Sequence, residues 1–386
     1  MKSKFITLQL GIKKNKTDGL LICLSDNNNT QIISTLNKFA AAPIILSKKN
    51  ISKSNPKYIF INSGNANACT GKEGLDNANA VLKLLALKLD CKKYEIIFMS
   101  TGIIGRQLPI EKICHAITNN KFNKYVSLKK SAMAIMTTDK FPKYSTKSYT
   151  IDSKKITFRG ICKGAGMIEP NMATMLAFIE TDVKINKGNL KKYLQYCSNL
   201  SFNSISVDGD MSTNDCVAFT SNNNVNLDLN NKKNLTKFLE CATDFFISLS
   251  SLIVKDGEGA TKIIELNIIN SKSLMAAQKI SRKISHSLLV KTAMYGQDPN
   301  WGRIIASLGS LDDLALNISK VKLFINDILC FSNGVPKDNG SKKLARSMKK
   351  NNIKIIIDLG VGKHSESLYF SDLSHEYVHI NSAYTT

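Results

Sequence analysis

Residues 160–182 have the sequence GICKGAGMIEPNMATMLAFIETD, in which a glycine-rich, polar segment stands directly before an apolar run. The run at 175–179 predicts a strand, and KGAG at 163–166 predicts a loop. An isolated threonine in this setting is normally a β-branched strand residue. A threonine that follows a small residue can instead attack the carbonyl carbon before it, and cleavage then leaves that threonine N-terminal. Its α-amine, with an ordinary pKa of about 8, would serve as general base for its own hydroxyl.

Strands and helices alternate on both sides of this segment. We expect strands at 57–62 and 94–99, a hairpin at 147–161 that turns near Ser153, and helices at 110–117, 187–199, 235–254 and 273–290. The asparagine runs at 27–29 and 222–224 are expected at loop tips. This order predicts an α/β protein built of layered sheets and helices.

The charge is strongly positive, with 53 Lys and Arg against 30 Asp and Glu, a net +23. A basic chain of this kind suggests nucleic acid or an anionic membrane as a partner. Only five of the basic residues are arginine, however, and base and phosphate recognition depend heavily on the planar arginine fork. Because the lysines are spread in small clusters without stacking aromatics, we favour a solvated basic surface. Nucleic-acid binding stays the less favoured alternative.

Other cofactor and catalytic patterns are missing from the sequence. No apolar run reaches the roughly 18 residues of a membrane helix, so we expect no membrane partner. The nine cysteines are scattered without a CxxC pair, which predicts reduced, mostly buried thiols in a cytoplasmic protein and no metal site. None of the five histidines stands in a nucleophile-like context, so a Ser-His-Asp triad is not expected. A threonine that carries its own base removes the need for a histidine.

Eight segments in order resemble the ArgJ family, and the match runs from about residue 11 to the last residue. The segments are NSGNANACTGKEGL (62–75), STGIIGRQLP (100–109), MTTDKFPK (136–143), 160–182, DGDMSTND (208–215), KDGEGATK (255–262), VKTAMYGQDPNWGR (290–303) and YVHINSAYTT (377–386). The resemblance implies a glutamate N-acetyltransferase, also called ornithine acetyltransferase, of arginine biosynthesis. It implies an α/β fold with the layered sheets and helices of the self-cleaving ornithine acetyltransferase (DmpA/ArgJ-like) type.

The resemblance also implies that the chain cuts itself between Ala173 and Thr174. The products would be an α chain of residues 1–173 and a β chain of residues 174–386. Thr174 would be the nucleophile that accepts the acetyl group. The Thr101 hydroxyl and the Gly102 backbone N–H would form the oxyanion hole, where one donor is typically worth about 3 to 4 kcal/mol.

Substrate-binding positions are implied in the same way, with Thr138 as the alternative to the first of them. They are Thr137, Lys163, Thr174, Glu258, Asn381 and Thr386. Lys163 offers a positive charge to the α-carboxylate of acetylornithine or glutamate, and Glu258 can pair with the cationic amine of ornithine. Because Asn381 and Thr386 stand near the end of the chain, a role in binding requires a docked tail.

The reaction implied by the resemblance is a ping-pong acyl transfer from N2-acetylornithine to glutamate. It needs no metal or organic cofactor, and whether acetyl-CoA is a second donor stays open. The resemblance also implies an assembly of two α and two β chains. The alternative within enzymes is a related self-cleaving aminopeptidase or amidohydrolase, which would release the acyl group to water.

Self-cleavage can be tested on a denaturing gel. Dividing 42.6 kDa in proportion to 173 and 213 residues predicts two bands of about 19 and about 24 kDa. We expect Thr174→Ala to give one uncut, inactive chain, because the substitution removes the attacking hydroxyl. Efficient cutting of that variant would refute the assignment of Thr174.

Overall fold

The chain forms two units, each with its own sheets. The computed structural model describes all residues except 1, 170–174, 313–315, 339 and 384–386. Unit 1 comprises the described residues of Met1–Asn203 and Asp210–Ile253, and unit 2 comprises those of Ser204–Gly209 and Val254–Tyr384. In the described part of the chain, no helix is long and apolar enough to cross a membrane.

Unit 1 contains two sheets. Sheet A has the order β1-β2-β4-β5, with β1 (Lys4–Leu8), β2 (Gly19–Cys23), β4 (Tyr58–Asn65) and β5 (Ile96–Ile103). Sheet B has the order β3-β10-β8-β7-β6, with β3 (Asn29–Ser34), β6 (Lys143–Ile151), β7 (Lys154–Lys163), β8 (Leu176–Val183) and β10 (Cys216–Val225). The helices are α1 (Ala42–Lys53), α2 (Gly71–Lys88), α3 (Ile110–Asn119), α4 (Leu128–Ile135), α5 (Lys187–Asn199) and α6 (Lys232–Lys255), whose last two residues belong to unit 2; η1 (Lys93–Glu95) and η2 (Phe202–Ser204) are 3-10 turns.

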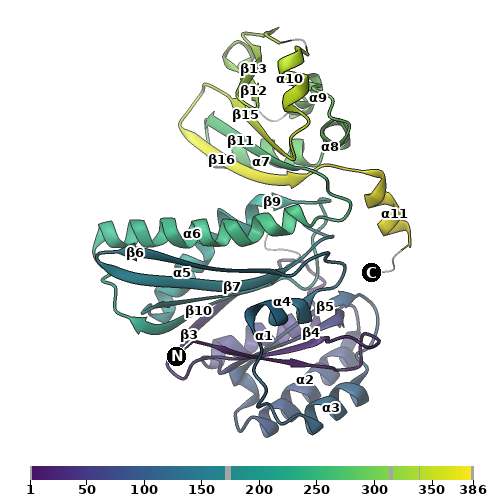
Figure 1. Cartoon of the computed structure of the whole chain (residues 1–386), viewed down its shortest axis with the longest axis vertical. Helices are drawn as coiled ribbons and strands as arrows, with labels where there is room; N and C mark the ends of the chain where they lie inside the picture. Colours follow the sequence, from purple (N-terminus) through teal and green to yellow (C-terminus); the bar gives the residue numbers. More distant parts are fainter. Residues whose placement is uncertain (1, 170–174, 313–315, 339, 384–386) are drawn as a thin grey trace. The chain divides into compact units, whose positions relative to one another are not determined.

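The two sheets of unit 1 are stacked between layers of helices, as Figure 1 shows for α2 and α3 on one side and α5 and α6 on the other. Strand alternation explains the stacking, because successive side chains point to opposite faces. Ile59 and Ile61 of β4 join a core shared with Leu176 and Phe178 of sheet B. Phe60 between them joins the core under α2 and α3. Both faces of sheet A are therefore buried.

The far face of sheet B is covered by an aromatic cluster. Phe158 of β7 lies 5.6 Å, between ring centroids, from both Phe238 and Phe245 of α6. Phe219 of β10 makes an edge contact with Phe246, with centroids 5.4 Å apart. All five rings are fully buried. Such ring pairs stabilise the packing by more than the burial of their apolar surface alone, and they hold α6 on this face of sheet B.

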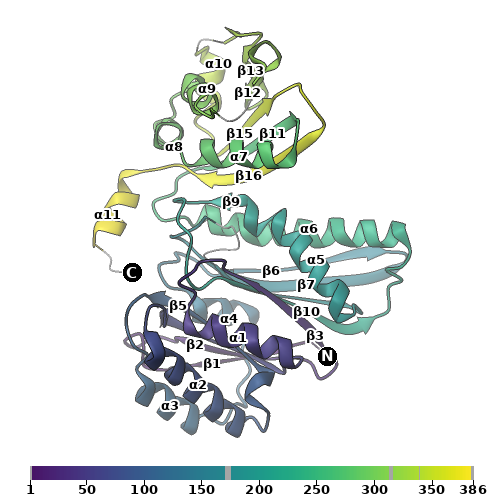
Figure 2. The same cartoon turned by 180° about the vertical axis from the view of Figure 1, so that it is seen from behind.

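Helix α1 covers the edge strand β5 (Figure 2). Ser47 Oγ accepts a hydrogen bond from the Phe98 backbone N–H at 2.7 Å and donates one to the Phe98 carbonyl at 2.7 Å. Asn50 Nδ2 donates to the Ile96 carbonyl at 2.9 Å. Backbone groups on an edge strand otherwise face solvent or a foreign strand. The polar residues of α1 therefore close this edge of sheet A.

Unit 2 is built on one mixed sheet, of order β14-β13-β12-β15-β11-β16-β9. Its elements are β9 (Ile205–Ser206), β11 (Ile263–Ser271), α7 (Leu274–Ser285), α8 (Leu288–Tyr295), α9 (Trp301–Gly309), η3 (Ile318–Lys320), β12 (Lys322–Ile325), β13 (Ile328–Ser332), β14 (Val335–Pro336), α10 (Lys342–Ser347), β15 (Asn352–Asp358), β16 (His364–Ser371) and α11 (His375–Ala383). Alternate residues of β11, Ile264, Leu266 and Ile268, pack with residues of α7, α8, α9 and α10. The opposite residues of β11 are only partly buried, so the helices cover one face.

Most of the expected elements are present, and the α/β prediction is confirmed. Asp152 and Ser153, with φ of 51° and 57°, form the two-residue turn of the expected hairpin. The single helix expected at 273–290 is wrong, because Ser287 caps a second helix by accepting from the Val290 N–H.

Two further expectations differ from the structure. Residues 222–224 are no loop tip but part of β10, where Asn223 has φ 55° at an irregularity of the ladder and Asn222 is buried against Glu180. The nine cysteines are free thiols as expected, but only four of them are buried. The others lie on partly or fully exposed faces of strands, helices and loops.

Candidate active site

The expected oxyanion residues lie where β4 and β5 end. Gly64 pairs with Gly102, and Asn65 pairs with both Thr101 and Ile103, so the ladder is irregular at this point. Gly102 has φ 131°, and a Cβ there would lie 2.3 Å from the carbonyl carbon of Gly64. Only glycine fits this approach. An irregular ladder changes the direction of the strand and of its peptide groups. Gly102 therefore holds a fixed, non-standard backbone conformation near the end of β5, directly after Thr101.

The buried side-chain amide of Asn214 holds the backbone next to Thr101 in place. Asn214 Nδ2 donates to the Ser100 carbonyl at 2.9 Å and to the Ala66 carbonyl at 2.7 Å. Ser100 Oγ donates to the same Ala66 carbonyl at 2.7 Å. Asn214 lies in the segment DGDMSTND, for which the sequence suggested no individual role. Its contacts make it a positioning residue for the strand that carries Thr101.

Lys163 reaches the same point from sheet B. It is the last residue of β7, and it pairs with Leu176, the first residue of β8. Its Nζ donates to Thr101 Oγ1 at 3.1 Å, although the residues are 62 positions apart in sequence. An ammonium group only donates, so the Thr101 oxygen is the acceptor and its own hydrogen is directed to another group. The contact leaves the Thr101 hydroxyl as a polarised donor, which is what an oxyanion hole requires.

Asp139 connects Lys163 to the segment of Thr137. One carboxylate oxygen of Asp139 accepts from Lys143 Nζ at 2.6 Å and from the Gly164 N–H at 2.9 Å. The other oxygen accepts from the Thr137 N–H at 2.8 Å. Asp139 and Lys143 have fully buried side chains. The carboxylate thus fixes the residue after Lys163 and the backbone of Thr137 around one point.

The charge of Asp139 is maintained despite its burial. Burial alone would raise the pKa of this carboxyl, because it disfavours the charged form. The ammonium groups of Lys163 and Lys143 and the hydrogen bonds from Lys143 and Thr137 outweigh burial and hold the pKa at about 2. Asp139 is therefore an anion at neutral pH and counters the two buried cations beside it.

Two further predicted residues meet within unit 2. Asn381 Nδ2 of α11 donates to Glu258 Oε2 at 3.0 Å. Gly259, with φ 68°, allows the backbone of Tyr377 to approach so closely that a Cβ would lie 2.3 Å from its nitrogen. Ser374 Oγ donates to the Gly259 carbonyl at 2.6 Å. Helix α11 is thus docked on the loop that carries Glu258, as binding by Asn381 requires.

The predicted residues fall into three groups. Ala173, Thr174 and Thr386 lie outside the described residues. Thr101, Gly102, Thr137 and Lys163 gather in unit 1, while Glu258 and Asn381 pair in unit 2. The choice between Thr137 and Thr138 stays open, and among the described residues no group of His, Cys, Asp or Glu could hold a metal ion. Sequence reasoning missed Asp139 and Asn214, although both stand in quoted motifs.

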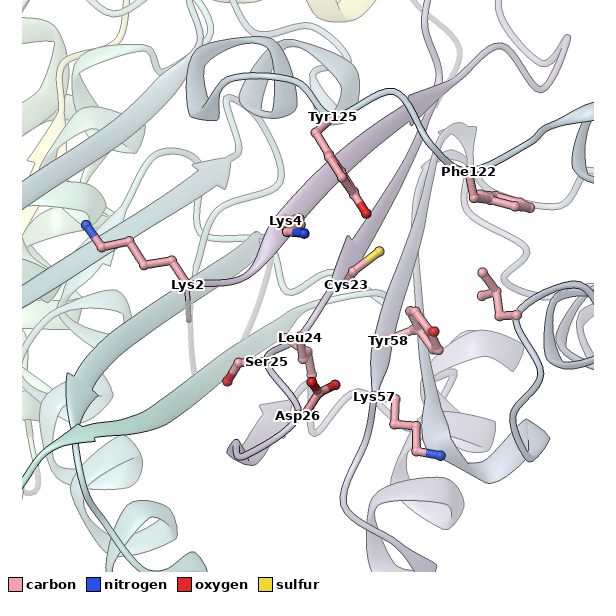
Figure 3. Close-up of a pocket in the computed structure, with 11 residues that line it drawn as sticks. Lys2, Lys4, Cys23, Leu24, Ser25, Asp26, Lys57, Tyr58, Phe122 and Tyr125 are labelled. Carbon is pink, nitrogen blue, oxygen red and sulfur yellow. The ribbon is translucent and has the colours of Figure 1, made fainter.

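Figure 3 shows a cavity whose lining includes none of the predicted site residues. It has a volume of about 360 Å³ and is lined by Lys4 at the start of β1, Cys23 at the end of β2 and Tyr58 at the start of β4. Gly64 lies six residues further along β4. At about 3.3 Å per residue, the cavity is about 20 Å from the point where Gly64 pairs with Gly102.

Comparisons with known proteins agree on one family. The model of the ArgJ family matches residues 4–386. The arginine biosynthesis bifunctional protein ArgJ of Caldanaerobacter subterraneus subsp. tengcongensis is 39% identical, over 97% of this chain and 95% of that protein. The protein of the same name from Geobacter sulfurreducens is 36% identical, over 99% of this chain and 98% of that one. A crystal structure of arginine biosynthesis bifunctional protein argJ from Bacillus halodurans is 33% identical with a TM-score of 0.52, and the match covers 55% of this chain and all of that one.

The ionised state of Asp139 predicts a loss of stability when its charge is removed. Asp139→Asn removes the buried carboxylate charge that the Lys143 ammonium contacts, and we expect a loss of about 3 to 5 kcal/mol in the free energy of unfolding. Because the folded pKa lies below the unfolded value, the contribution is present above pH of about 4 and is lost as the pH falls toward 2. Urea unfolding measured between pH 3 and pH 7 checks both points.

Asp244→Asn is the matched control, because Asp244 pairs with Lys147 on the surface at 2.9 Å. We expect this change to cost less than about 1 kcal/mol. Equal losses in the two variants would contradict the role given to Asp139.

Proposed function

The chain belongs to the ArgJ family, and on that basis we propose that it transfers the acetyl group of N2-acetylornithine to glutamate through an acetyl ester on Thr174. The observation that carries the proposal is the bond from Lys163 Nζ to Thr101 Oγ1. It joins a predicted substrate-binding cation to a predicted oxyanion donor. These two segments are distant in sequence, and an acyl transferase needs both functions at one place.

The first half-reaction forms the ester. After the cut at Ala173–Thr174, the α-amine of Thr174 takes the proton of its own hydroxyl. The oxygen attacks the acetyl carbonyl of N2-acetylornithine and a C–O bond forms. The tetrahedral oxyanion is stabilised by the Thr101 hydroxyl and the Gly102 N–H. The C–N bond then breaks, and the amine of ornithine leaves with the proton that the α-amine had taken.

The second half-reaction reverses these steps with a different amine. The neutral α-amine of glutamate attacks the ester carbonyl, and the same two donors stabilise the second oxyanion. The C–O bond breaks, the Thr174 hydroxyl recovers its proton, and N-acetylglutamate leaves. Since both substrates pass through one ester, they share the position of the reacting nitrogen and of the α-carboxylate.

Substrate recognition follows from the charges of the proposed site. Lys163 offers its ammonium to the α-carboxylate of either substrate. Within the described part of the chain, the Glu258 carboxylate accepts one side-chain hydrogen bond, from Asn381 to Oε2. A carboxylate can accept about four hydrogen bonds in all. The side-chain ammonium of ornithine suits the remaining positions. Thr137, or Thr138, and the terminal Thr386 complete the proposed binding set.

The proposal includes no metal and no organic cofactor, since the α-amine, the hydroxyl and the two oxyanion donors account for each step. Acetyl-CoA as a second acetyl donor is part of the proposal, supported by the word bifunctional in the names of the relatives. The assembly of two α and two β chains and the cytoplasmic location stay predictions from the family resemblance.

Product analysis tests the function directly. The purified protein is incubated with glutamate and N2-acetylornithine that carries a labelled acetyl group. We expect labelled N-acetylglutamate and an equal amount of ornithine, and no transfer by Thr174→Ala. Free labelled acetate as the sole product would contradict acetyl transfer and support the amidohydrolase alternative.

The oxyanion role of Thr101 predicts a loss that depends on its hydroxyl. Thr101→Val removes the hydroxyl and keeps the shape, so we expect kcat to fall by about 10² to 10³ with a much smaller change in KM for acetylornithine. Thr101→Ser is the matched control because it keeps the donor, and it should retain most of the activity. Steady-state kinetics of both variants decide the point, and equal losses in the two would exclude a donor role.

A further inference from the structure

Lys13 lies in a loop whose backbone is fixed by a buried carboxylate. Asp18, which is fully buried, accepts hydrogen bonds from the backbone N–H of Leu10 at 2.5 Å, Ile12 at 2.7 Å and Lys13 at 2.9 Å. Three bonds to one carboxylate hold the loop between β1 and β2 in a single conformation. The starting point of the Lys13 side chain is therefore determined.

The side chain of Lys13 runs from Gly64, the ladder partner of Gly102, to the segment of Thr137. A Cβ on Gly64 would lie 2.9 Å from Lys13 Cγ, so the stem of the lysine crosses Gly64 directly. Gly64 is the partner of Gly102 in the ladder. At its other end, Lys13 Nζ donates to the Met136 carbonyl at 3.0 Å, one residue before Thr137. Lys13 is thus in contact with both sides of the candidate site in unit 1.

Lys13 is a second cation close to Lys163. Burial lowers the pKa of Lys13 most, and the nearby ammonium groups of Lys16 and Lys163 lower it further, while Asp18 and Asp139 raise it. Both carboxylates already accept hydrogen bonds from other groups. Asp18 accepts from the backbone of its own loop, and Asp139 accepts from Lys143 and from the backbone N–H groups of Gly164 and Thr137. Two partly desolvated cations beside each other favour a ligand that brings negative charge.

The two substrates of the proposed reaction differ in that charge. Both carry an α-carboxylate, for which one lysine is enough. The side chain of ornithine ends in an ammonium, whereas the side chain of glutamate ends in a second carboxylate. The negative charge of Glu258 attracts the side-chain ammonium of ornithine and repels the side-chain carboxylate of glutamate. An enzyme that uses both substrates at one ester therefore needs a separate cation for the side chain of the acceptor.

We propose that Lys13 binds the side-chain carboxylate of glutamate and so determines the specificity for the acceptor. The inference rests on the proposed function, because it assigns a residue to the second half-reaction. It gives the loop between β1 and β2 a role that neither the motifs nor the family resemblance suggested. Lys163 remains the residue that serves both substrates.

Two exchange reactions separate the half-reactions. Labelled ornithine exchanging into N2-acetylornithine uses only the donor side, and labelled glutamate exchanging into N-acetylglutamate uses only the acceptor side. We expect Lys13→Met to raise the KM for glutamate relative to the KM for ornithine by about 10- to 100-fold, the range of one charged hydrogen bond. Lys13→Arg keeps the charge and should recover part of the loss.

Lys14→Met is the matched control, because Lys14 is the next residue of the same loop and its side chain is exposed to solvent, whereas that of Lys13 is half-buried. We expect its ratio of KM values to equal that of the wild type. A Lys13→Met ratio that stays unchanged, or two KM values that rise together, would overturn the assignment of Lys13. Absence of both exchanges in the wild type would instead contradict the proposed function, so the two failures are distinguishable.

Discussion

The carboxylate of Asp139 is the point on which the geometry of the site in unit 1 depends. It holds the residue after β7, the first residue of β6 and the backbone that follows α4. Because Gly164 is fixed, Lys163 is directed at Thr101 rather than toward solvent. A buried ion pair is seldom a net source of stability, since desolvation costs about as much as the attraction returns. The Asp139 carboxylate instead serves to orient the site, because its two oxygens bind three separate segments of the chain.

Much of the fold could be predicted from the sequence, because strand alternation and helical periodicity are local properties. The strands that begin at Tyr58 and Ile96 and the hairpin turn at Asp152 and Ser153 follow from such patterns. The errors have two causes, a distant partner in one case and a local helix cap in the other. Asn222 looked like a loop residue, but Glu180 on the neighbouring strand satisfies its amide. The break at Ser287 depends on a cap within an apolar pattern that continues on both sides.

The site could be predicted only in part, and the missing part has a physical cause. Motif residues such as Thr101 and Lys163 came from a resemblance, whereas their hydrogen bond depends on the packing of two sheets. Asp139, Asn214 and Lys13 act on backbone groups or through charge, and their sequence neighbours do not reveal those partners. In a chain with so many lysines, one lysine is recognisable only by what surrounds it.

The β7–β8 hairpin has a consequence for the state of the enzyme after the expected cut. In sheet B, β3, β7 and β6 precede position 173, whereas β10 and β8 follow it. The two products therefore meet along two ladders, β3 with β10 and β7 with β8, each with six paired positions. The joint between them is the interior of a sheet that is covered on both faces. A cut at that position would leave both ladders intact, so the two products would stay together as one noncovalent folding unit that separates only by unfolding.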